Sequence, residues 1–322
     1  MQASNSIELS AFAADVRRGL SSSPKQLSSR YFYDDEGSRL FMEIMKLPEY
    51  YPTRAELKIF KEQTEGIYQA FTEGVESIDL IELGAGDGTK TAVLIEYFMA
   101  KGLDLDYSPI DISQEANDAL SARFHEKLPE LSVKPYTGDY FQILDTLNNG
   151  NGRRKVLMFL GSNIGNFQRD KALDFFRALS GVMSPKDRLF VGFDMQKDPR
   201  VIVNAYDDPT GVTAAFNLNL LTRINRELGA DFDITNFSHY AQYRPVECAA
   251  RSFLISREKQ SVTITALDQI FHFEQWEPIF MEISQKYTRS MIEELAVNSG
   301  FAIETEFFDG EYFYTDSLWR RT

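Results

Sequence analysis

The chain has 322 residues and a formal net charge of −14, with 43% hydrophobic and 25% charged residues. This balance is typical of a soluble globular protein that forms one large domain or two modest ones. The negative charge is spread along the chain, and nucleic acids and anionic membranes both require a cationic face, so we expect neither as a partner.

The first 60 residues are rich in tyrosine and have a helical pattern. Their start lacks the basic segment and apolar core of a signal peptide. No stretch of the chain approaches the roughly 20 consecutive apolar residues of a membrane span. We therefore expect a cytoplasmic protein.

From residue 77 onward, short apolar runs alternate with longer amphipathic segments. The predicted strands are 77–83, 106–112, 131–140, 154–163 and 187–195. The predicted helices are 89–103, 114–128 and 168–180. Strands that alternate with helices in this way form right-handed βαβ units and a parallel sheet covered on both faces.

The end of the chain departs from this alternation. Residues 301–321 are predicted to form two strands joined by Asp309-Gly310, a dipeptide typical of tight hairpins. A parallel α/β sheet finished by an antiparallel hairpin resembles the seven-stranded Rossmann-like methyltransferase sheet. We expect 62–196 and 287–322 to form that domain.

Two blocks, 1–61 and 197–286, do not follow the alternation. The second contains a predicted helix over 210–229 and a predicted antiparallel pair of strands within 248–267. We interpret the two blocks as a smaller α+β substrate-binding domain over the carboxyl edge of the sheet, where open α/β sheets bind ligands.

A glycine-rich loop follows the first strand of the sheet. Residues 81–90 read IELGAGDGTK, with glycines at Gly84, Gly86 and Gly88. A dinucleotide-binding loop has the spacing G-x-G-x-x-G, whereas the expected third glycine is Thr89 here. Glu82 and Asp87 would repel a pyrophosphate but suit a cationic sulfonium amino acid. The remaining alternative is a tight turn with no ligand.

Acidic residues end the next two predicted strands. Asp111, 27 residues beyond Gly84, is placed to accept hydrogen bonds from ribose hydroxyls. Asp139 is placed to accept from the adenine amino group while Tyr140 packs on the ring. Together with the loop, these residues predict S-adenosylmethionine as the cofactor. Lys90 is either a solvated residue of the first helical turn or a partner for the cofactor's carboxylate.

Three further segments make a family resemblance specific. They are YFYDDEGSRLFMEIMKLPEYYPTRAE (31–56), FLGSNIGNF (159–167) and MEISQKY (281–287). With the glycine loop, they make the chain resemble the histidine-specific Nα-methyltransferase family of ergothioneine biosynthesis. The resemblance covers nearly the whole chain. It implies S-adenosylmethionine-dependent methylation of the α-nitrogen of L-histidine, to the trimethyl product.

The resemblance also implies roles for individual substrate-side residues. Asn166 would hold the amino-acid backbone of the substrate, and Tyr206 its carboxylate. Tyr33 and Tyr50 would line the amine side, and they are the candidate catalytic residues. From their pattern alone, the tyrosines are equally consistent with ordinary amphipathic packing. On the cofactor side, the positions that match the family are Gly84, Gly86, Lys90, Asp111 and Asp139.

Glu282 and Ser284 match the pair that grips the imidazole ring in this family. Side chains two apart in a strand face the same way. A carboxylate accepts from one imidazole N–H, and a hydroxyl can bond the other nitrogen. The alternative is an edge strand with a polar face. The family more often has threonine at Asn163, after Ser162, which affects no group assigned here.

The reaction implied is in-line attack of the amine on the activated methyl group, in which catalysis rests mostly on orientation. The α-ammonium must first lose a proton, to water or through a tyrosine hydroxyl. Two other functions stay open: the same chemistry on another amino acid, such as a tryptophan derivative, and a non-catalytic S-adenosylmethionine-binding module. A dehydrogenase is disfavoured by the glycine spacing. We expect a monomer whose partner is a small amino-acid substrate.

The remaining reactive side chains suggest no further site. The single cysteine, Cys248, excludes an internal disulfide, and we expect it to be a small buried hydrophobic residue. The three histidines show no metal-ligand spacing with one another or with this cysteine, so we expect no metal.

Overall fold

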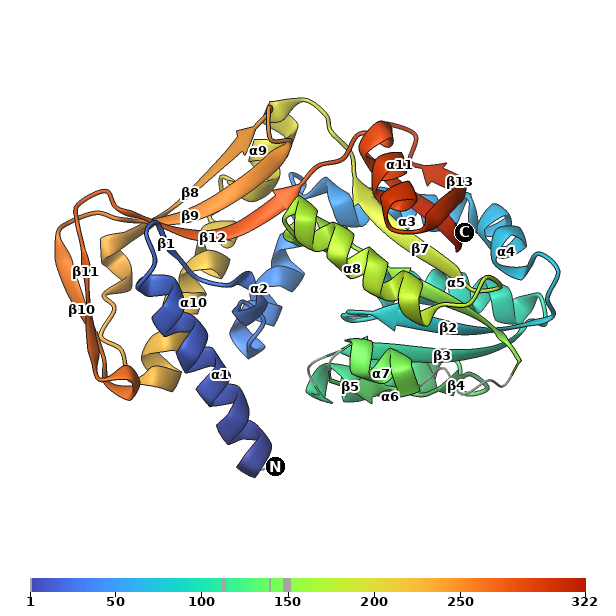
Figure 1. The fold of residues 1–322 in the computed structure, drawn as a ribbon, viewed down its shortest axis with the longest axis horizontal. Coiled ribbons are helices and arrows are strands. Elements are labelled where there is room, and N and C mark those ends of the chain that lie inside the picture. Colours follow the sequence, from blue (N-terminus) through green and yellow to red (C-terminus); the bar gives the residue numbers. More distant parts are fainter. Residues whose placement is uncertain (1, 112–113, 139, 147–151) are drawn as a thin grey trace. The chain divides into compact units, whose positions relative to one another are not determined.

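The protein is described by a computed structural model that covers residues 2–111, 114–138, 140–146 and 152–322 (Figure 1). The chain forms two compact units. The smaller unit contains residues 1–51 and 197–284, and the larger unit contains 52–196 and 285–322. These boundaries differ from the expected 61/62 and 286/287, so most of helix α3 (Tyr51–Glu62) lies with the larger unit.

The larger unit is built on a sheet with the strand order β13-β14-β7-β6-β2-β3-β4. β5 also pairs with β3, at residues farther along β3 than those that pair with β4. The strands are β2 (Ser77–Leu83), β3 (Asp104–Asp111), β4 (Ser132–Val133), β5 (Tyr136–Thr137), β6 (Arg154–Phe159), β7 (Arg188–Asp194), β13 (Phe301–Phe308) and β14 (Tyr314–Arg321). β14 is antiparallel to both β7 and β13, whereas the other pairs are parallel. The predicted parallel sheet with a terminal hairpin is confirmed.

The strand predicted over 131–140 is wrong in its extent. It consists of two short pieces, β4 and β5, on either side of Pro135. Proline has no N–H to donate to a strand ladder, so the strand is interrupted there. Tyr140, at the end of the predicted strand, instead begins a helix, α7 (Tyr140–Thr146).

Helices cover both faces of this sheet, and each face has its own core (Figure 1). The other helices are α4 (Thr64–Thr72), α5 (Thr89–Ala100), α6 (Gln114–Lys127), α8 (Arg169–Val182) and α11 (Arg289–Asn298). In β2, Ile78 and Leu80 pack in the core formed with α3 to α6. Ile81 and Leu83 pack in the core formed with α7, α8 and α11. This burial on both faces explains the continuous apolar run of β2.

The smaller unit contains a four-stranded sheet of order β1-β12-β9-β8 and a separate pair, β10-β11. Its strands are β1 (Lys25–Gln26), β8 (Phe237–Arg244), β9 (Ala249–Ser256), β10 (Gln260–Ile264), β11 (Gln269–Phe273) and β12 (Pro278–Gln285). Its helices are α1 (Gln2–Leu20), α2 (Asp35–Ile44), α9 (Pro199–Tyr206) and α10 (Val212–Leu228). The helix predicted over 210–229 is confirmed as α10.

The predicted pairing within 248–267 is wrong. β9 and β10 both exist, but β9 lies between β8 and β12, and β10 pairs with β11. The apolar residues of these strands pack with α1, α2 and α10 in one core. β9 therefore pairs with the strand that precedes it in the chain, and β10 pairs with the strand that follows it.

Candidate active site

The glycine loop between β2 and α5 has three left-handed residues. The φ angles are 72° at Gly84, 57° at Gly86 and 66° at Gly88. The Gly84 N–H donates to the Ile110 carbonyl at 2.8 Å, which holds the loop against the end of β3. A Cβ on Gly88 would lie 2.7 Å from the Phe124 ring, whereas nothing lies within 4 Å of a Cβ on Gly86. The missing side chain of Gly88 therefore allows Phe124 to pack against the loop. The backbone at Gly86 is not covered by neighbouring atoms.

The two acidic residues near this loop have different surroundings. Glu82 is buried, and it accepts hydrogen bonds from Thr91 Oγ1 at 2.8 Å and Tyr107 Oη at 2.6 Å. Burial raises the pKa of Glu82 to about 7 despite these bonds. Burial also acts on Asp87, but hydrogen bonds from Thr89 and Arg123 lower the pKa of that carboxyl. Asp87 is therefore the charged carboxylate of the loop, and the Glu82 oxygens serve neighbouring hydroxyls.

Two predicted cofactor residues lie at the same edge of the sheet. Asp111 ends β3 and is half-buried. The hydroxyl of Tyr140 lies 3.1 Å from the position of a Cβ on Gly84, so it adjoins the loop. Asp139 lies outside the described residues. A carboxylate, a phenol and an open glycine backbone at the carboxyl ends of parallel strands fit an adenosine-containing sulfonium amino acid.

Of the two alternatives for Lys90, a solvated residue of the first helical turn is wrong. Its ammonium pairs with Glu56 of α3, and only 22% of its side chain is exposed. Burial opposes this charge, but the Glu56 carboxylate raises the pKa of Lys90. Glu56 is not among the predicted site residues, because a glutamate in an amphipathic helix is usually solvated. It is nevertheless the last residue of the 31–56 segment.

Asn166 lies in the loop after β6, as predicted. It ends a short 3-10 helix, η2 (Asn163–Asn166), and its side chain is exposed. The start of this loop is held by Ser162, whose Oγ accepts a hydrogen bond from the Asp194 N–H at 3.1 Å. The amide is therefore accessible at the carboxyl end of the sheet.

The smaller unit brings Tyr206 and Ser284 into contact. Tyr206 is the last residue of α9, and its hydroxyl donates to Ser284 Oγ at 2.7 Å. His239 Nε2 lies 2.9 Å from the Tyr206 carbonyl oxygen, in hydrogen-bonding geometry. Glu282 and Ser284 belong to β12, which lies between β1 and β9. β1 pairs with β12 only at Ile279 and Phe280, so Glu282 and Ser284 lie beyond β1, and the edge-strand alternative stays open.

The rings of Tyr33 and Tyr50 both contact the ring of Phe41. The ring centroids are 5.5 Å apart for Tyr33–Phe41 and 6.2 Å apart for Phe41–Tyr50. The pKa of Tyr33 is raised, first by reduced hydration of the hydroxyl and then by the negative charge of Glu282. Tyr33, Glu282, Tyr206 and Ser284 thus form one polar cluster in the smaller unit.

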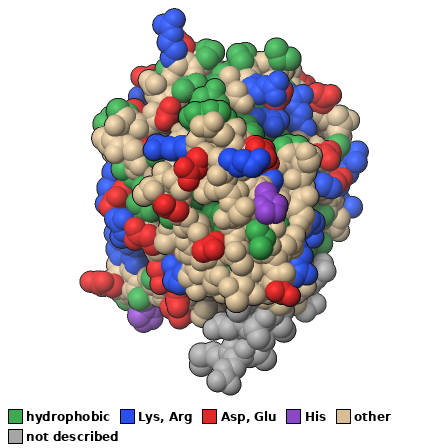
Figure 2. Space-filling model, turned by 90° about the vertical axis from the view of Figure 1, so that its left-hand side faces the viewer, with side chains coloured by type: hydrophobic (Ala, Val, Ile, Leu, Met, Phe, Trp, Pro, Cys, Tyr) green, Lys and Arg blue, Asp and Glu red, His purple; other side chains and the backbone are tan. Residues whose placement is uncertain are grey.

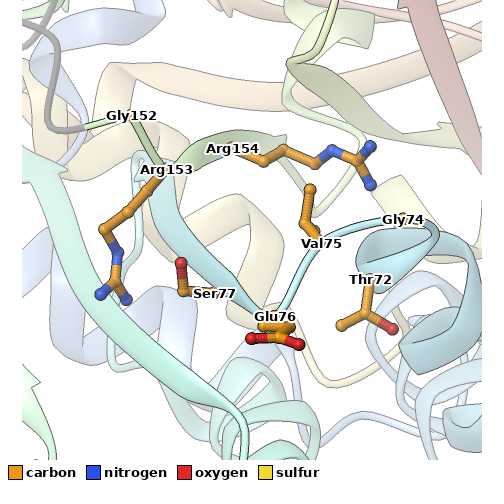
Figure 3. Close-up of a pocket in the computed structure, with 8 residues that line it drawn as sticks. All are labelled: Thr72, Gly74, Val75, Glu76, Ser77, Gly152, Arg153 and Arg154. Carbon is orange, nitrogen blue, oxygen red and sulfur yellow. The ribbon is translucent and has the colours of Figure 1, made fainter.

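A polar cavity of about 620 Å³ lies at the opposite edge of the sheet (Figure 3). Ser77 and Arg154, which line it, are the first residues of β2 and β6. Arg153 is paired with Asp79 and Asp104, and Figure 3 shows the two arginine side chains pointing to opposite sides. Open α/β sheets bind ligands at the carboxyl ends of their strands, so we assign this cavity no part in the chemistry.

Other expectations concern metals, membranes and Cys248. Among the described residues, no group of three or more histidine, cysteine, aspartate or glutamate side chains could hold a metal ion. Within the same part of the chain, no helix is long and apolar enough to cross a membrane. The expected burial of Cys248 is wrong. It is half-buried in the β8–β9 turn with a φ of 53°, and its thiol contacts the Pro245 carbonyl at 3.3 Å.

The sequence matches a family described as histidine-specific, S-adenosylmethionine-dependent methyltransferases over residues 12–321. It is 37% identical over 277 residues to a histidine N-alpha-methyltransferase of Mycobacterium tuberculosis (strain CDC 1551 / Oshkosh). The aligned region covers 86% of this chain and 84% of that relative. A protein of the same name from Mycolicibacterium smegmatis is 36% identical over 287 residues, with 89% and 88% covered. Ergothioneine biosynthesis protein 1 of Schizosaccharomyces pombe is 28% identical over 288 residues, with 88% and 37% covered. The chain belongs to the family of histidine-specific, S-adenosylmethionine-dependent methyltransferases.

Proposed function

We propose that this protein, an S-adenosylmethionine-dependent histidine Nα-methyltransferase, carries L-histidine to the trimethyl product in ergothioneine biosynthesis. The names of its relatives support both the substrate and the pathway. The observation that carries the proposal is the polar cluster of Tyr33, Glu282, Tyr206 and Ser284 in the smaller unit. It combines a carboxylate and hydroxyls, the groups that an imidazole and an amino acid require.

Each substrate residue has a proposed task. Glu282 accepts a hydrogen bond from an imidazole N–H, and Ser284 bonds the other ring nitrogen. Tyr206 donates to the substrate carboxylate, and Asn166 holds the amino-acid backbone. Asn166 belongs to the larger unit, and Tyr206, Glu282 and Ser284 belong to the smaller unit.

The proposed cofactor residues are Gly84, Gly86, Lys90, Asp111, Asp139 and Tyr140. Bound S-adenosylmethionine supplies a methyl group that its sulfonium has already activated. The protein therefore contributes mainly orientation of the amine. The amine must also lose a proton. The raised pKa of Tyr33 keeps its hydroxyl protonated near neutral pH, so Tyr33 would take up this proton only while it passes its own proton to water.

Successive methylation requires walls that tolerate a growing cation. The rings of Tyr33 and Tyr50, which both contact Phe41, provide an aromatic surface. Such rings attract ammonium groups through cation–π interactions. We therefore assign Tyr33 and Tyr50 to the amine side of the substrate.

We also propose that the protein is a cytoplasmic monomer that binds no nucleic acid. The net charge of −14 argues against a nucleic-acid partner. On the face shown in Figure 2, lysine and arginine side chains are interspersed with aspartate and glutamate rather than gathered into a basic patch.

The test is incubation of the purified protein with S-adenosylmethionine and a pool of amino acids, followed by mass spectrometry. We expect histidine to gain up to three methyl groups, all on the α-nitrogen by fragmentation. Methyl groups on the imidazole would overturn the orientation, and methylation of tryptophan instead would overturn the substrate. Cofactor binding without any transfer would identify a non-catalytic module.

A further inference from the structure

Glu56 has no role in the mechanism above, although its carboxylate contacts three groups from other parts of the larger unit. It lies in α3 and is fully buried. Its Oε1 accepts hydrogen bonds from the Gly161 N–H at 2.8 Å and from the Tyr314 hydroxyl at 2.7 Å. Its Oε2 pairs with the Lys90 ammonium. Burial of an unpaired carboxylate would be unfavourable, and here every partner comes from a different segment of the larger unit.

Two of these partners belong to loops at the carboxyl edge of the sheet. Lys90 lies in the first turn of α5, directly after the glycine loop, and Gly161 begins the loop that leads to Asn166. The two loops adjoin each other, because a Cβ on Gly161 would lie 3.5 Å from Lys90 Nζ. Glu56 therefore links both loops to α3 through one carboxylate.

A second buried carboxyl, that of Asp316 in β14, lies beside Glu56. It is fully buried, and neither of its oxygens has a hydrogen-bond donor among the described residues while both carboxyls are ionised. Burial and the negative charge of Glu56 raise the pKa of Asp316 well above its usual value. Lys90 brings one positive charge to the two carboxyls. The charges balance when Asp316 keeps its proton and donates it in a hydrogen bond to Glu56.

We propose that Glu56 is a positioning residue for cofactor binding, which fixes the Lys90 ammonium and the Gly161 N–H at the methionine end of S-adenosylmethionine. An ammonium has three N–H donors, so Lys90 can pair with Glu56 and still bind the cofactor's carboxylate. The inference rests on the cofactor role proposed for Lys90. It differs from a purely electrostatic role, because charge alone predicts the opposite effect: without Glu56, Lys90 would attract a carboxylate more strongly.

The test is the dissociation constant of S-adenosylhomocysteine, which carries the same carboxylate, measured by titration calorimetry. Glu56→Gln keeps the size and one acceptor oxygen but removes the charge. We expect it to bind S-adenosylhomocysteine at least about tenfold more weakly, as for a lost charged hydrogen bond. The KM for histidine at saturating cofactor should change less than about twofold. Unchanged or tighter binding of S-adenosylhomocysteine would overturn the inference.

The matched control is Glu304→Gln, which removes the carboxylate paired with Arg188 at 2.5 Å, distant from both loops in the strand register. We expect it to leave S-adenosylhomocysteine binding unchanged. If Glu56→Gln does not fold, Glu56→Asp decides, since it keeps the charge but is one methylene shorter. Binding weakened about threefold or more supports the inference, and a smaller effect overturns it.

Lys90→Ala separates the two proposals. If it leaves S-adenosylhomocysteine binding unchanged, the cofactor role of Lys90 is wrong. If Lys90→Ala weakens binding while Glu56→Gln does not, only the positioning role of Glu56 is wrong.

Discussion

The hydroxyl of Tyr206 donates a hydrogen bond to Ser284 Oγ at 2.7 Å, although the family resemblance assigns these residues to opposite ends of the substrate. Ser284 is buried, so a ligand that takes the Tyr206 hydroxyl would change the hydrogen bonding of Ser284. In the proposed roles, an imidazole nitrogen would then bond Ser284. We therefore expect this contact to couple recognition of the carboxylate to recognition of the ring.

This coupling predicts non-additive mutations. Tyr206→Phe should lower kcat/KM for histidine by an amount equivalent to about 1.5–3 kcal/mol of transition-state free energy, because it removes a hydrogen bond to a charged group. Ser284→Ala should cost about 1 kcal/mol on the same scale. In the double variant we expect an interaction energy of about 0.5 kcal/mol or more. Steady-state kinetics with varied histidine measure all three variants. Strictly additive losses would mean that the two hydroxyls act independently.

Glu282 should control the choice of substrate. Glu282→Ala should lower kcat/KM for histidine by roughly 2–4 kcal/mol, since it removes a charged acceptor for the imidazole N–H. It should also relax discrimination against tryptophan, because no carboxylate is then desolvated against an apolar ring. The measurement is competition between histidine and tryptophan. Glu274→Ala, at a side chain that is 69% exposed, is the control. Full selectivity in Glu282→Ala would make Glu282 a structural residue.

Asp111 should contribute to cofactor affinity. Asp111→Ala removes a charged acceptor for the ribose hydroxyls and should weaken S-adenosylmethionine binding by about 1.5–3 kcal/mol in calorimetric titration. Asp118→Ala, on the exposed surface of α6, should not change it. Equal affinities of the Asp111 variant and the native protein would refute the assignment.

Glu82 should make stability depend on pH. Its pKa of about 7 in the folded protein exceeds the ordinary value of 4.5, so between these values the folded state binds more protons than the unfolded state. The free energy of unfolding therefore falls as pH rises from about 4.5 through about 7, by roughly 3 kcal/mol at most. Urea denaturation across this window measures the slope. Glu82→Gln should flatten it, and an identical slope in both proteins would contradict the prediction.

Alanine substitutions should separate backbone strain from packing in the glycine loop. Gly88→Ala should lower the free energy of unfolding by about 2–4 kcal/mol, because it combines the left-handed penalty with a clash against Phe124. Gly86→Ala and Gly74→Ala are open positions with φ angles of 57° and 72°, so they should lose only about 1–2 kcal/mol. Of these two, only Gly86→Ala should weaken S-adenosylmethionine binding. Equal destabilisation by all three would exclude the packing role of Gly88.

The pattern of residues predicted most elements of the larger unit. The runs that became β2, β6 and β7, and the hairpin turn at Asp309-Gly310, carry their signals locally, in the period of apolar side chains and in turn chemistry. The third strand was predicted too long, since the effect of Pro135 within it was not taken into account. The family resemblance placed Tyr206, Glu282 and Ser284 among the candidates, but it gave no indication that the hydroxyls of Tyr206 and Ser284 touch.

By itself, the sequence determined the alternation of strands and helices, the glycine loop and the antiparallel end of the sheet, because each depends on neighbouring residues. Only the tertiary structure decided that β9 pairs with β8 rather than with β10, that Tyr206 bonds Ser284, and that Glu56 is buried against Lys90. The last two of these contacts join residues far apart in the chain. Which of them form depends on the packing of the whole core, because a buried charge or hydroxyl is stable only where the fold brings it a partner.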